Sequence, residues 1–274
     1  MVPVIECQGA KIPVIGLGTM TLKGDVCVDA VSSALKMGYR HIDTAVYYGN
    51  EAEVGEGIRK SGISREDIFL TTKVRHTELA PGLFEKSVAG SLERLGLDYV
   101  DLLLVHWPNP DLPPSAYIPN LCQAKRNGQA QHIGVANFTV KLLEETLAIA
   151  DEPIVNNQIE VHPFLDQRTI LAECRRRNIS VTAYCPLGRG RIPGNPVLER
   201  IAKTHGKSEA QIALRWLVQQ ELIAIPRTAT PDKLKANIDI FDFMLADSEM
   251  KAISGLAEPD GRIITPPQSP DWDR

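Results

Sequence analysis

The sequence has no long apolar run and no excess of cationic residues. Nowhere do roughly 18 apolar residues follow one another, so no membrane-spanning helix is predicted. The opening residues MVPVIECQGA lack the positive start and apolar stretch of a secretory signal, and we therefore expect a cytoplasmic protein. Lys and Arg total 30 against 34 Asp and Glu, a net charge of −4. Binding to nucleic acid or to an anionic membrane needs a clear cationic excess, so neither is expected.

Cysteines are few and scattered. No two of them form a C-x-x-C pair, the spacing that would indicate a zinc site or a dithiol redox site. We expect all of them to be reduced and structural, and we predict no metal site. The five are Cys7, Cys27, Cys122, Cys174 and Cys185.

The glycine motifs that mark a nucleotide site are incomplete. Segments 16–21 (GLGTMT) and 188–193 (GRGRIP) both lack the third glycine of the dinucleotide-binding fingerprint. Gly206-Lys207-Ser208 looks like the end of a P-loop, but Ile201 stands where that loop needs its first glycine. Ser208 is better explained as a helix cap. Neither a Rossmann site nor a P-loop is predicted.

The sequence does contain a regular alternation of helical and strand-like apolar patterns, which is typical of βαβα chains. The expected strands cover residues 15–18, 41–43, 68–73, 100–106, 133–137, 154–158, 181–184 and 223–227. From Asp43 to Arg227 their ends are about 31 residues apart on average, the length of one βα unit. We predict a single (β/α)8 TIM-barrel domain over residues 1–274, with a doubly wound open sheet as the alternative.

Local signals predict further elements. Residues 4–14, turned at Gln8-Gly9, are expected to form an N-terminal β-hairpin cap, and auxiliary helices are expected at 196–203 and 209–219. Apolar stripes predict helices that contain Val28, Val31 and Leu35; Phe84, Val88, Leu92 and Leu95; and Leu143, Leu147 and Ala150. Capping side chains are expected at Asn50 with Glu53, at Ser208 with Gln211, and at Thr230 before Pro231.

A polar or aromatic side chain closes most of the expected strands. The carboxyl ends of all strands of such a barrel meet at one mouth, where the catalytic groups of this fold converge. One such residue alone would more simply be a strand end that faces solvent, but seven together indicate a functional mouth. They are Asp43, Lys73, His106, Asn137, Gln158, Tyr184 and Arg227.

Some of these side chains suit proton transfer. Tyr47 and Tyr48 follow the second strand, and spacing alone does not choose between the two phenols. We expect the Lys73 ammonium to lower the pKa of the neighbouring phenol. Asp43 would hold Lys73 charged, while His106 would direct a carbonyl oxygen toward the phenol. The alternative is that Asp43 and Lys73 form a structural ion pair.

The end of the last strand suits a phosphate. Arg227 and Thr228 run directly into a helix that starts near Thr230, and Lys233 follows one turn on. Free N–H groups at a helix start favour an anion, and phosphate sites recur at this corner of the barrel. The alternative is a solvated helix start with ordinary surface charges.

These residues together resemble the aldo-keto reductase family, in order and over the whole chain. Among its branches the chain is most similar to the bacterial 2,5-diketo-D-gluconate reductases of the B type, because of its compact length, its short loop after Trp107 and its ending at 270–273. The motifs are GLGT at 16–19, HIDTA at 41–45 with Tyr48 beyond it, TK at 72–73, HWP at 106–108, GVANF at 134–138, NQIE at 157–160, AYCPLG at 183–188 and IPRT at 225–228.

The resemblance implies a barrel that binds NADPH and reduces carbonyls. It places Asp43, Tyr48, Lys73 and His106 on the family's catalytic tetrad, and so selects Tyr48 over Tyr47. It implies cofactor contacts at Asn137 and Gln158 for the carboxamide, Tyr184 for the nicotinamide ring, Cys185, Leu187 and Gly188 for the pyrophosphate, and Arg227, Thr228, Lys233 and Asn237 for the adenosine 2′-phosphate end.

The chain departs from the family pattern at several positions. Ala136 replaces a usual Ser beside the nicotinamide, and Ala236 a frequent Glu near the adenine. Arg227 and Lys233 look like the family's Lys and Arg exchanged in place. Met20 and Arg75 replace frequent aromatics at the substrate pocket, of which Trp107 is expected to form another wall.

We therefore expect a monomeric, NADPH-dependent reductase whose partners are small-molecule carbonyls, such as methylglyoxal or 2,5-diketo-D-gluconate. The tail from Pro259 onward is expected to fold back over the barrel mouth. Two alternatives are a cofactor-binding protein with little turnover and a lyase that uses Lys73 as a Schiff-base nucleophile.

Overall fold

The computed structural model describes residues 2–273, and its centre is a parallel sheet of eight strands in chain order. These are β3 (Leu17–Gly18), β4 (His41–Asp43), β5 (Phe69–Val74), β6 (Val100–Val105), β7 (Ala130–Ala136), β8 (Ile154–Glu160), β9 (Ser180–Tyr184) and β10 (Ile223–Ala224). The first and last strands also meet, because Ile15 bridges Ala224 and the N–H of Gly18 donates to the carbonyl of Pro226 at 3.2 Å. The sheet therefore closes into the expected (β/α)8 barrel.

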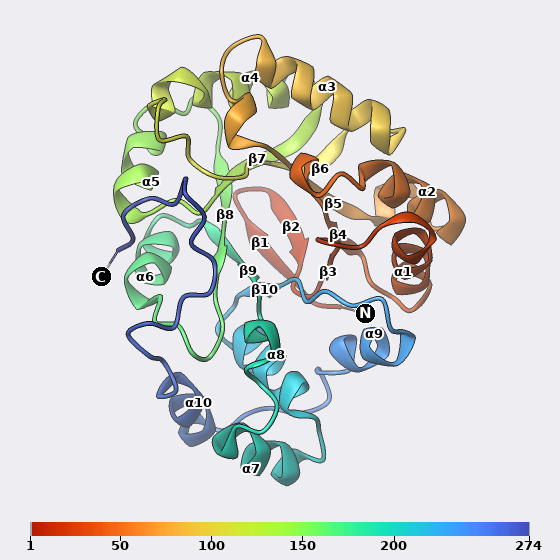
Figure 1. The fold of residues 1–274 in the computed structure, drawn as a ribbon, viewed down its shortest axis with the longest axis vertical. Helices are drawn as coiled ribbons and strands as arrows, with labels where there is room; N and C mark the ends of the chain where they lie inside the picture. The colour runs from red at the N-terminus through yellow and green to blue at the C-terminus, as the bar shows by residue number, and fades with distance from the viewer. Residues whose placement is uncertain (1, 274) are drawn as a thin grey trace.

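Helices surround the strands, as Figure 1 shows. Those that follow the successive strands are α1 (Gly24–Lys36), α2 (Glu51–Ser61), α3 (Leu83–Leu95), α4 (Ile118–Arg126), α5 (Val140–Leu147), α6 (Arg168–Arg176), α8 (Glu209–Gln219) and α9 (Pro231–Ile238). Two auxiliary helices, α7 (Pro196–His205) and α10 (Asp247–Ser254), pack outside α8 and against each other. Short 3-10 helices lie at Val46–Tyr48, Arg65–Asp67, His76–Glu78, Pro114–Ala116 and Gly188–Gly190.

The predicted hairpin consists of β1 (Val4–Cys7) and β2 (Ala10–Pro13) and closes the amino-terminal end of the barrel. Gln8 donates a hydrogen bond to the carbonyl of Ile154, the first residue of β8, at 2.9 Å. Ala10 and Ile12 join the apolar side chains inside the barrel, among them Phe69 and Leu102. Because the hairpin plugs one end, the opposite end, where the strands finish, remains for a functional mouth.

The structure confirms the barrel, the hairpin and the capping box of Ser208 with Gln211, and it corrects three local expectations. Asn50 precedes α2 but does not cap it, because its buried side chain donates to the carbonyls of Thr19 and Leu22 instead. Thr230 precedes α9 without a side-chain cap. The third apolar stripe is shorter than expected, since α5 ends at Leu147 and leaves Ala150 outside.

Candidate active site

Lys73 lies at the centre of the predicted tetrad, on β5 and fully buried. Its Nζ donates to Oδ1 of Asp43 at 2.6 Å, to the carbonyl of Thr44 at 2.8 Å and to the hydroxyl of Tyr48 at 3.3 Å. Neighbouring parallel strands bring these groups together, because β4 and β5 pair with Asp43 opposite Thr71. All three ammonium hydrogens therefore have acceptors, and one acceptor is a phenol.

This geometry distinguishes the two tyrosines that spacing left equal. Tyr48 is half-buried and its hydroxyl contacts Lys73, whereas the Tyr47 side chain is 61% exposed. Because Lys73 donates to the Tyr48 oxygen, the phenolic hydrogen of Tyr48 is left for another acceptor. Tyr48 is thus the phenol placed to give up a proton.

The expectation that Lys73 lowers the pKa of Tyr48 is wrong for this state of the protein. Burial and the nearby Asp43 carboxylate raise the pKa of Tyr48 well above its usual value. The physical reason is that burial disfavours the charged phenolate, and that the Asp43 carboxylate paired with Lys73 offsets the effect of the ammonium. Burial also lowers the pKa of Lys73, while Asp43 acts in the opposite direction and holds the ammonium charged.

His106 follows β6 and faces the phenol. Its ring lies 5.6 Å from the Tyr48 ring, centre to centre, with the planes at 82°. Burial, together with the charge of Lys73, lowers the pKa of His106 well below its usual value, so the imidazole is neutral near pH 7. Its ring nitrogens have no hydrogen-bond partner among residues 2–273, which leaves them free for a substrate oxygen.

Three residues expected at the nicotinamide are linked to the tetrad. Gln158 on β8 donates to Oδ2 of Asp43 at 2.7 Å. Tyr184 at the end of β9 donates its hydroxyl hydrogen to Oδ1 of Asn137 at 2.7 Å, and Nδ2 of Asn137 donates to the carbonyl of His106 at 2.9 Å. Side chains therefore join the ends of β6, β7 and β9 to one another, and β8 to β4, around one mouth.

The segment expected at the pyrophosphate follows β9. Cys185 is half-buried and Gly188 is buried, both with positive φ angles of 50° and 56°, and Leu187 between them is half-buried. A side chain at Gly188 would meet the ring of Phe164 at 3.3 Å. Burial raises the pKa of the Cys185 thiol, and the nearby cations Arg189 and Arg227 oppose that shift. Arg227 thus lies close to this segment, although 42 positions separate it from Cys185.

The residues expected at the 2′-phosphate lie between β10 and α9. Arg227 and Lys233 are exposed and form no ion pair within the described part of the chain. Thr228 and Asn237 are buried, and the Thr228 hydroxyl accepts a hydrogen bond from the N–H of Thr230 at 3.1 Å. Two unpaired cations therefore flank a helix start whose first residues carry no side-chain cap.

The predicted substrate wall is only partly assembled by contacts in the structure. The Arg75 guanidinium lies 5.1 Å from the centre of the Tyr47 ring, and its buried Nε has no hydrogen-bond partner. Trp107 is buried and its ring centre lies 6.1 Å from that of Trp272, with the planes at 69°, so the tail does fold back to the mouth. Met20 follows β3 and is 38% exposed.

Two buried carboxylates escaped the sequence analysis. Glu51 on α2 accepts hydrogen bonds from Thr72 at 2.5 Å and from Arg94, and lies behind Lys73. Glu160 ends β8 and binds backbone N–H groups of the tail. The sequence predicted that this strand ends at Gln158, but β8 ends at Glu160. A predicted strand end two residues later would have identified Glu160 as a candidate site residue.

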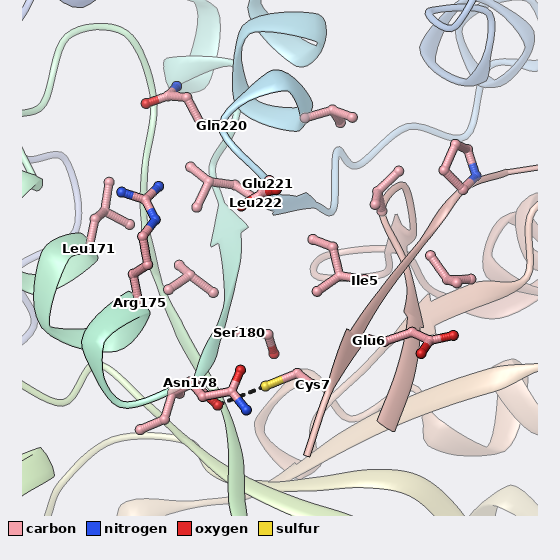
Figure 2. Close-up of a pocket in the computed structure, with 16 residues that line it drawn as sticks. Ile5, Glu6, Cys7, Leu171, Arg175, Asn178, Ser180, Gln220, Glu221 and Leu222 are labelled. Carbon is pink, nitrogen blue, oxygen red and sulfur yellow. Dashed lines mark hydrogen bonds between the residues drawn. The ribbon is translucent and has the colours of Figure 1, made fainter. Parts of the chain in front are cut away.

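A separate cavity of about 450 Å³ lies at the other end of the barrel, beneath the hairpin (Figure 2). It is lined by Ile5 and Cys7 of β1, by Ser180 at the start of β9, and by residues of α6 and α8. The Cys7 thiol donates to the carbonyl of Asn178 at 2.9 Å, the dashed line in Figure 2. None of the expected site residues lines this cavity, so it is not part of the mouth.

Within residues 2–273, no cluster of three or more His, Cys, Asp or Glu side chains is arranged to hold a metal ion. No helix in the same range is long and apolar enough to cross a bilayer. All five cysteines are free thiols.

Comparison with known proteins gives matches over almost the whole chain. The model of the Aldo/keto reductase family matches residues 14–258. The morphine 6-dehydrogenase of Pseudomonas putida is 40% identical over 91% of this chain and 89% of its own length. A provisionally assigned 2,5-diketo-D-gluconic acid reductase B superposes with a TM-score of 0.98 at 46% identity, covering 100% of this chain and 98% of that one. The Bombyx mori aldo-keto reductase, solved in complex with NADP, gives a TM-score of 0.88 at 34% identity over 93% of both chains.

Proposed function

The chain belongs to the aldo-keto reductase family, and on that premise we propose that it reduces small aldehydes or ketones with NADPH. The reaction consumes one carbonyl, one NADPH and one proton and yields an alcohol and NADP+. The proposal assigns residues 1–274 to one catalytic domain, which is supported by a core that runs from Val14 to Ile253. A monomeric, cytoplasmic enzyme remains our expectation.

The observation that carries the proposal is the hydrogen bond from Lys73 to the oxygen of Tyr48. It orients the phenol so that its hydrogen points away from the ammonium, toward whatever oxygen enters the mouth. The raised pKa keeps Tyr48 protonated until a carbonyl oxygen gains negative charge. A cation 3.3 Å from the phenol oxygen then stabilises the phenolate that remains.

The other tetrad residues support this proton transfer. Asp43 fixes Lys73 by an ion pair of 2.6 Å and is itself held by Gln158. His106 is neutral and its ring nitrogens are free, so it can donate one hydrogen bond to the carbonyl oxygen and polarise it. Tyr48 therefore gives up the proton, Lys73 and Asp43 orient the phenol, and His106 polarises the carbonyl.

The residues at the mouth also fit a nicotinamide dinucleotide phosphate. The exposed, unpaired cations Arg227 and Lys233 suit the 2′-phosphate, and Thr228 and Asn237 line the same corner. Cys185, Leu187 and Gly188 would hold the pyrophosphate, and Asn137, Gln158 and Tyr184 the nicotinamide. When bound, NADPH supplies the hydride that the protein lacks. A relative from Bombyx mori has been solved with NADP, which supports this choice.

The substrate wall supports small polar or anionic carbonyls, such as methylglyoxal or 2,5-diketo-D-gluconate. Trp107 and Trp272 pack against each other and form one side of this wall. Arg75 carries a buried, unpartnered Nε beside Tyr47, and so offers a cation to a substrate carboxylate. Met20 would complete this wall.

The lyase alternative has less support. A Schiff base requires Lys73 to lose its proton and present a free lone pair to a carbonyl. Instead its three hydrogens are directed to Asp43, Thr44 and Tyr48. The assay described next distinguishes a reductase from a protein that binds the cofactor without turnover.

The test follows NADPH absorbance at 340 nm with methylglyoxal and the purified protein, comparing Tyr48→Phe with Tyr47→Phe. Tyr48→Phe removes the proton donor and keeps the ring, so we expect kcat to fall by about 100-fold or more. Tyr47→Phe, a matched change at the neighbouring exposed phenol, should leave kcat within about twofold. Both variants should bind NADPH as the wild type does, measured by fluorescence titration.

Two results would contradict the proposal. Equal turnover of the Tyr48→Phe variant and the wild type would remove Tyr48 from the reaction. No NADPH consumption by the wild type with any of a panel of aldehydes, despite NADPH binding, would favour the binding protein.

A further inference from the structure

Glu160 closes β8 at the barrel mouth, and its carboxylate is completely buried. Oε1 accepts a hydrogen bond from the N–H of Ile263 at 2.7 Å, and Oε2 accepts one from the N–H of Ile264 at 2.9 Å. Oε1 also lies 2.9 Å from Nε2 of His162. The N–H of Phe164 donates to Nδ1 of His162, so Nε2 carries the hydrogen and donates it to Glu160.

These contacts make the C-terminal segment, residues 259–273, part of the carboxylate's environment. A buried carboxylate is stable only where hydrogen bonds replace the water that it has lost. Two of the three N–H groups that Glu160 accepts from belong to the C-terminal segment. Release of the segment would leave a buried charge with one partner, and Glu160 therefore opposes that release.

The start of the C-terminal segment is fitted closely to the loop after β8. The N–H of Glu258 donates to the carbonyl of Phe164 at 3.1 Å, and Glu258 is ion-paired with Arg191. A Cβ atom at Gly261 would lie 1.8 Å from the same Phe164 oxygen, so only glycine fits there. The chain therefore reaches Ile263 in a fixed position.

The same segment carries the side chain that meets the substrate wall. The Arg262 guanidinium lies 3.6 Å from the centre of the Trp272 ring, and Trp272 packs in a T-shaped arrangement with Trp107, which follows His106 in the chain. The carboxylate of Asp273 accepts a hydrogen bond from the N–H of Val140 at 3.0 Å. In Figure 1 the segment, in dark blue, runs upward from α10 and ends beside α5.

We propose that Glu160 is a positioning residue of the substrate site. By binding the N–H groups of Ile263 and Ile264, it holds Trp272 against Trp107 and so sets the affinity for the carbonyl substrate. It has no part in proton transfer or in binding the cofactor. This inference rests on the proposed function, because the affinity concerned is that for the substrate of the reductase.

The test is Glu160→Gln, which keeps the shape but replaces one acceptor oxygen with a donor. In either orientation of the amide, a backbone N–H of the C-terminal segment then faces an NH2 group. Hydrogen bonds to a charged group are among the stronger ones, so we expect the KM for methylglyoxal to rise by about tenfold. We expect kcat and the Kd for NADPH to stay within about twofold.

A second readout follows the segment itself and needs no turnover. Trypsin cleaves after arginine, and release of peptide 263–274 by mass spectrometry reports access to the bond after Arg262. We expect Glu160→Gln to release this peptide faster than the wild type, because one of the two N–H groups that follow this bond, that of Ile263 or that of Ile264, has lost its acceptor.

The matched control is Glu249→Gln on α10. Glu249 also binds a histidine Nε2, that of His205, and a backbone N–H, that of Ala246, but it contacts neither the C-terminal segment nor the mouth. We expect this variant to keep the wild-type KM and the wild-type rate of peptide release. Should Glu160→Gln fail to fold, Glu160→Asp keeps the charge, shortens the reach and carries the same expectations.

The outcomes separate this inference from the proposed function. Faster peptide release with an unchanged KM would overturn the positioning role, since the segment would then be loose without effect on substrate. A parallel change in KM, kcat and NADPH affinity would also overturn it, in favour of a general structural role. A wild type without any turnover would overturn the proposed function, and this inference with it.

Discussion

Two histidines of the barrel, His41 on β4 and His106 after β6, are held neutral by burial. His41 lies at the start of β4, with Nδ1 3.3 Å from the carbonyl of Pro13 and Nε2 3.2 Å from the hydroxyl of Thr71. Burial lowers the pKa of His41 from 6.5 to about 4. At His106 the same effect serves the proposed chemistry, whereas at His41 it makes stability depend on pH.

The sign of that dependence follows from proton binding. Between pH 6.5 and about 4, the unfolded chain binds a proton at His41 that the native protein does not bind. We expect the free energy of unfolding to fall by up to about 3 kcal/mol from this residue as the pH is lowered through that window. Urea unfolding at several pH values, for the wild type and His41→Asn, measures it. Parallel curves for the two proteins would exclude His41 as the cause.

For single residues, the identity of the catalytic side chains was easier to predict from the sequence than their pKa shifts. The strand ends Asp43, Lys73 and His106 follow from the sequence because parallel strands must finish at a common edge. The choice of Tyr48 needed either the family resemblance or the contact with Lys73. The direction of the Tyr48 pKa shift could not be predicted, because it depends on burial and on how far the charge of Lys73 is neutralised by Asp43.

Helix packing at the next scale depends on where a glycine lets two backbones approach. Gly55 on α2 faces the end of α3, and a Cβ atom there would lie 2.1 Å from the carbonyl oxygen of Leu95. Gly90 on α3 has no such neighbour, since the nearest atom is the flexible Nη1 of Arg94 at 2.9 Å. Close helix packing therefore requires glycine at Gly55 but not at Gly90.

We expect the same substitution to change stability in opposite directions at these positions. Gly55→Ala forces α2 and α3 apart and should lower the free energy of unfolding by about 1–3 kcal/mol. Gly90→Ala removes a poor helix former, displaces only the end of the Arg94 side chain and no backbone, and should raise it by about 0.5–1 kcal/mol. Thermal unfolding of both variants checks this, and a loss of stability of equal size at both sites would refute the packing argument.

The order and type of the elements could be predicted because each βα unit repeats the same two periods. Capping was less predictable. Asn50 has the composition of a helix cap, but its side chain is drawn into the core by the carbonyls of Thr19 and Leu22. The prediction also made the eighth strand too long, because residues 225–227 look like a strand, whereas β10 ends at Ala224. Tertiary contacts decided both cases.

Over the whole molecule, the net charge of −4 works against an anionic cofactor. A dinucleotide phosphate adds several negative charges, so its attraction has to come from cations close to the binding site rather than from the overall field. Arg227 and Lys233 are such cations, exposed and unpaired at the start of α9. The burial of Lys73 and its pairing with Asp43 make it unsuitable for that task.

We therefore expect preference for NADPH over NADH to depend on Arg227 and Lys233, and not on Lys235, the other cation of α9. Each charge-assisted contact with the 2′-phosphate contributes about 1.5–3 kcal/mol, so Arg227→Ala or Lys233→Ala should lower the NADPH/NADH affinity ratio by about tenfold or more. Lys235→Ala is the matched control, because Lys235 is also exposed but lies about 200° around the helix from Lys233. Fluorescence titrations with both cofactors give the ratio, and added salt should reduce it in the wild type more than in the Arg227→Ala variant. Equal affinities of the wild type for NADPH and NADH would show instead that these cations serve another anion.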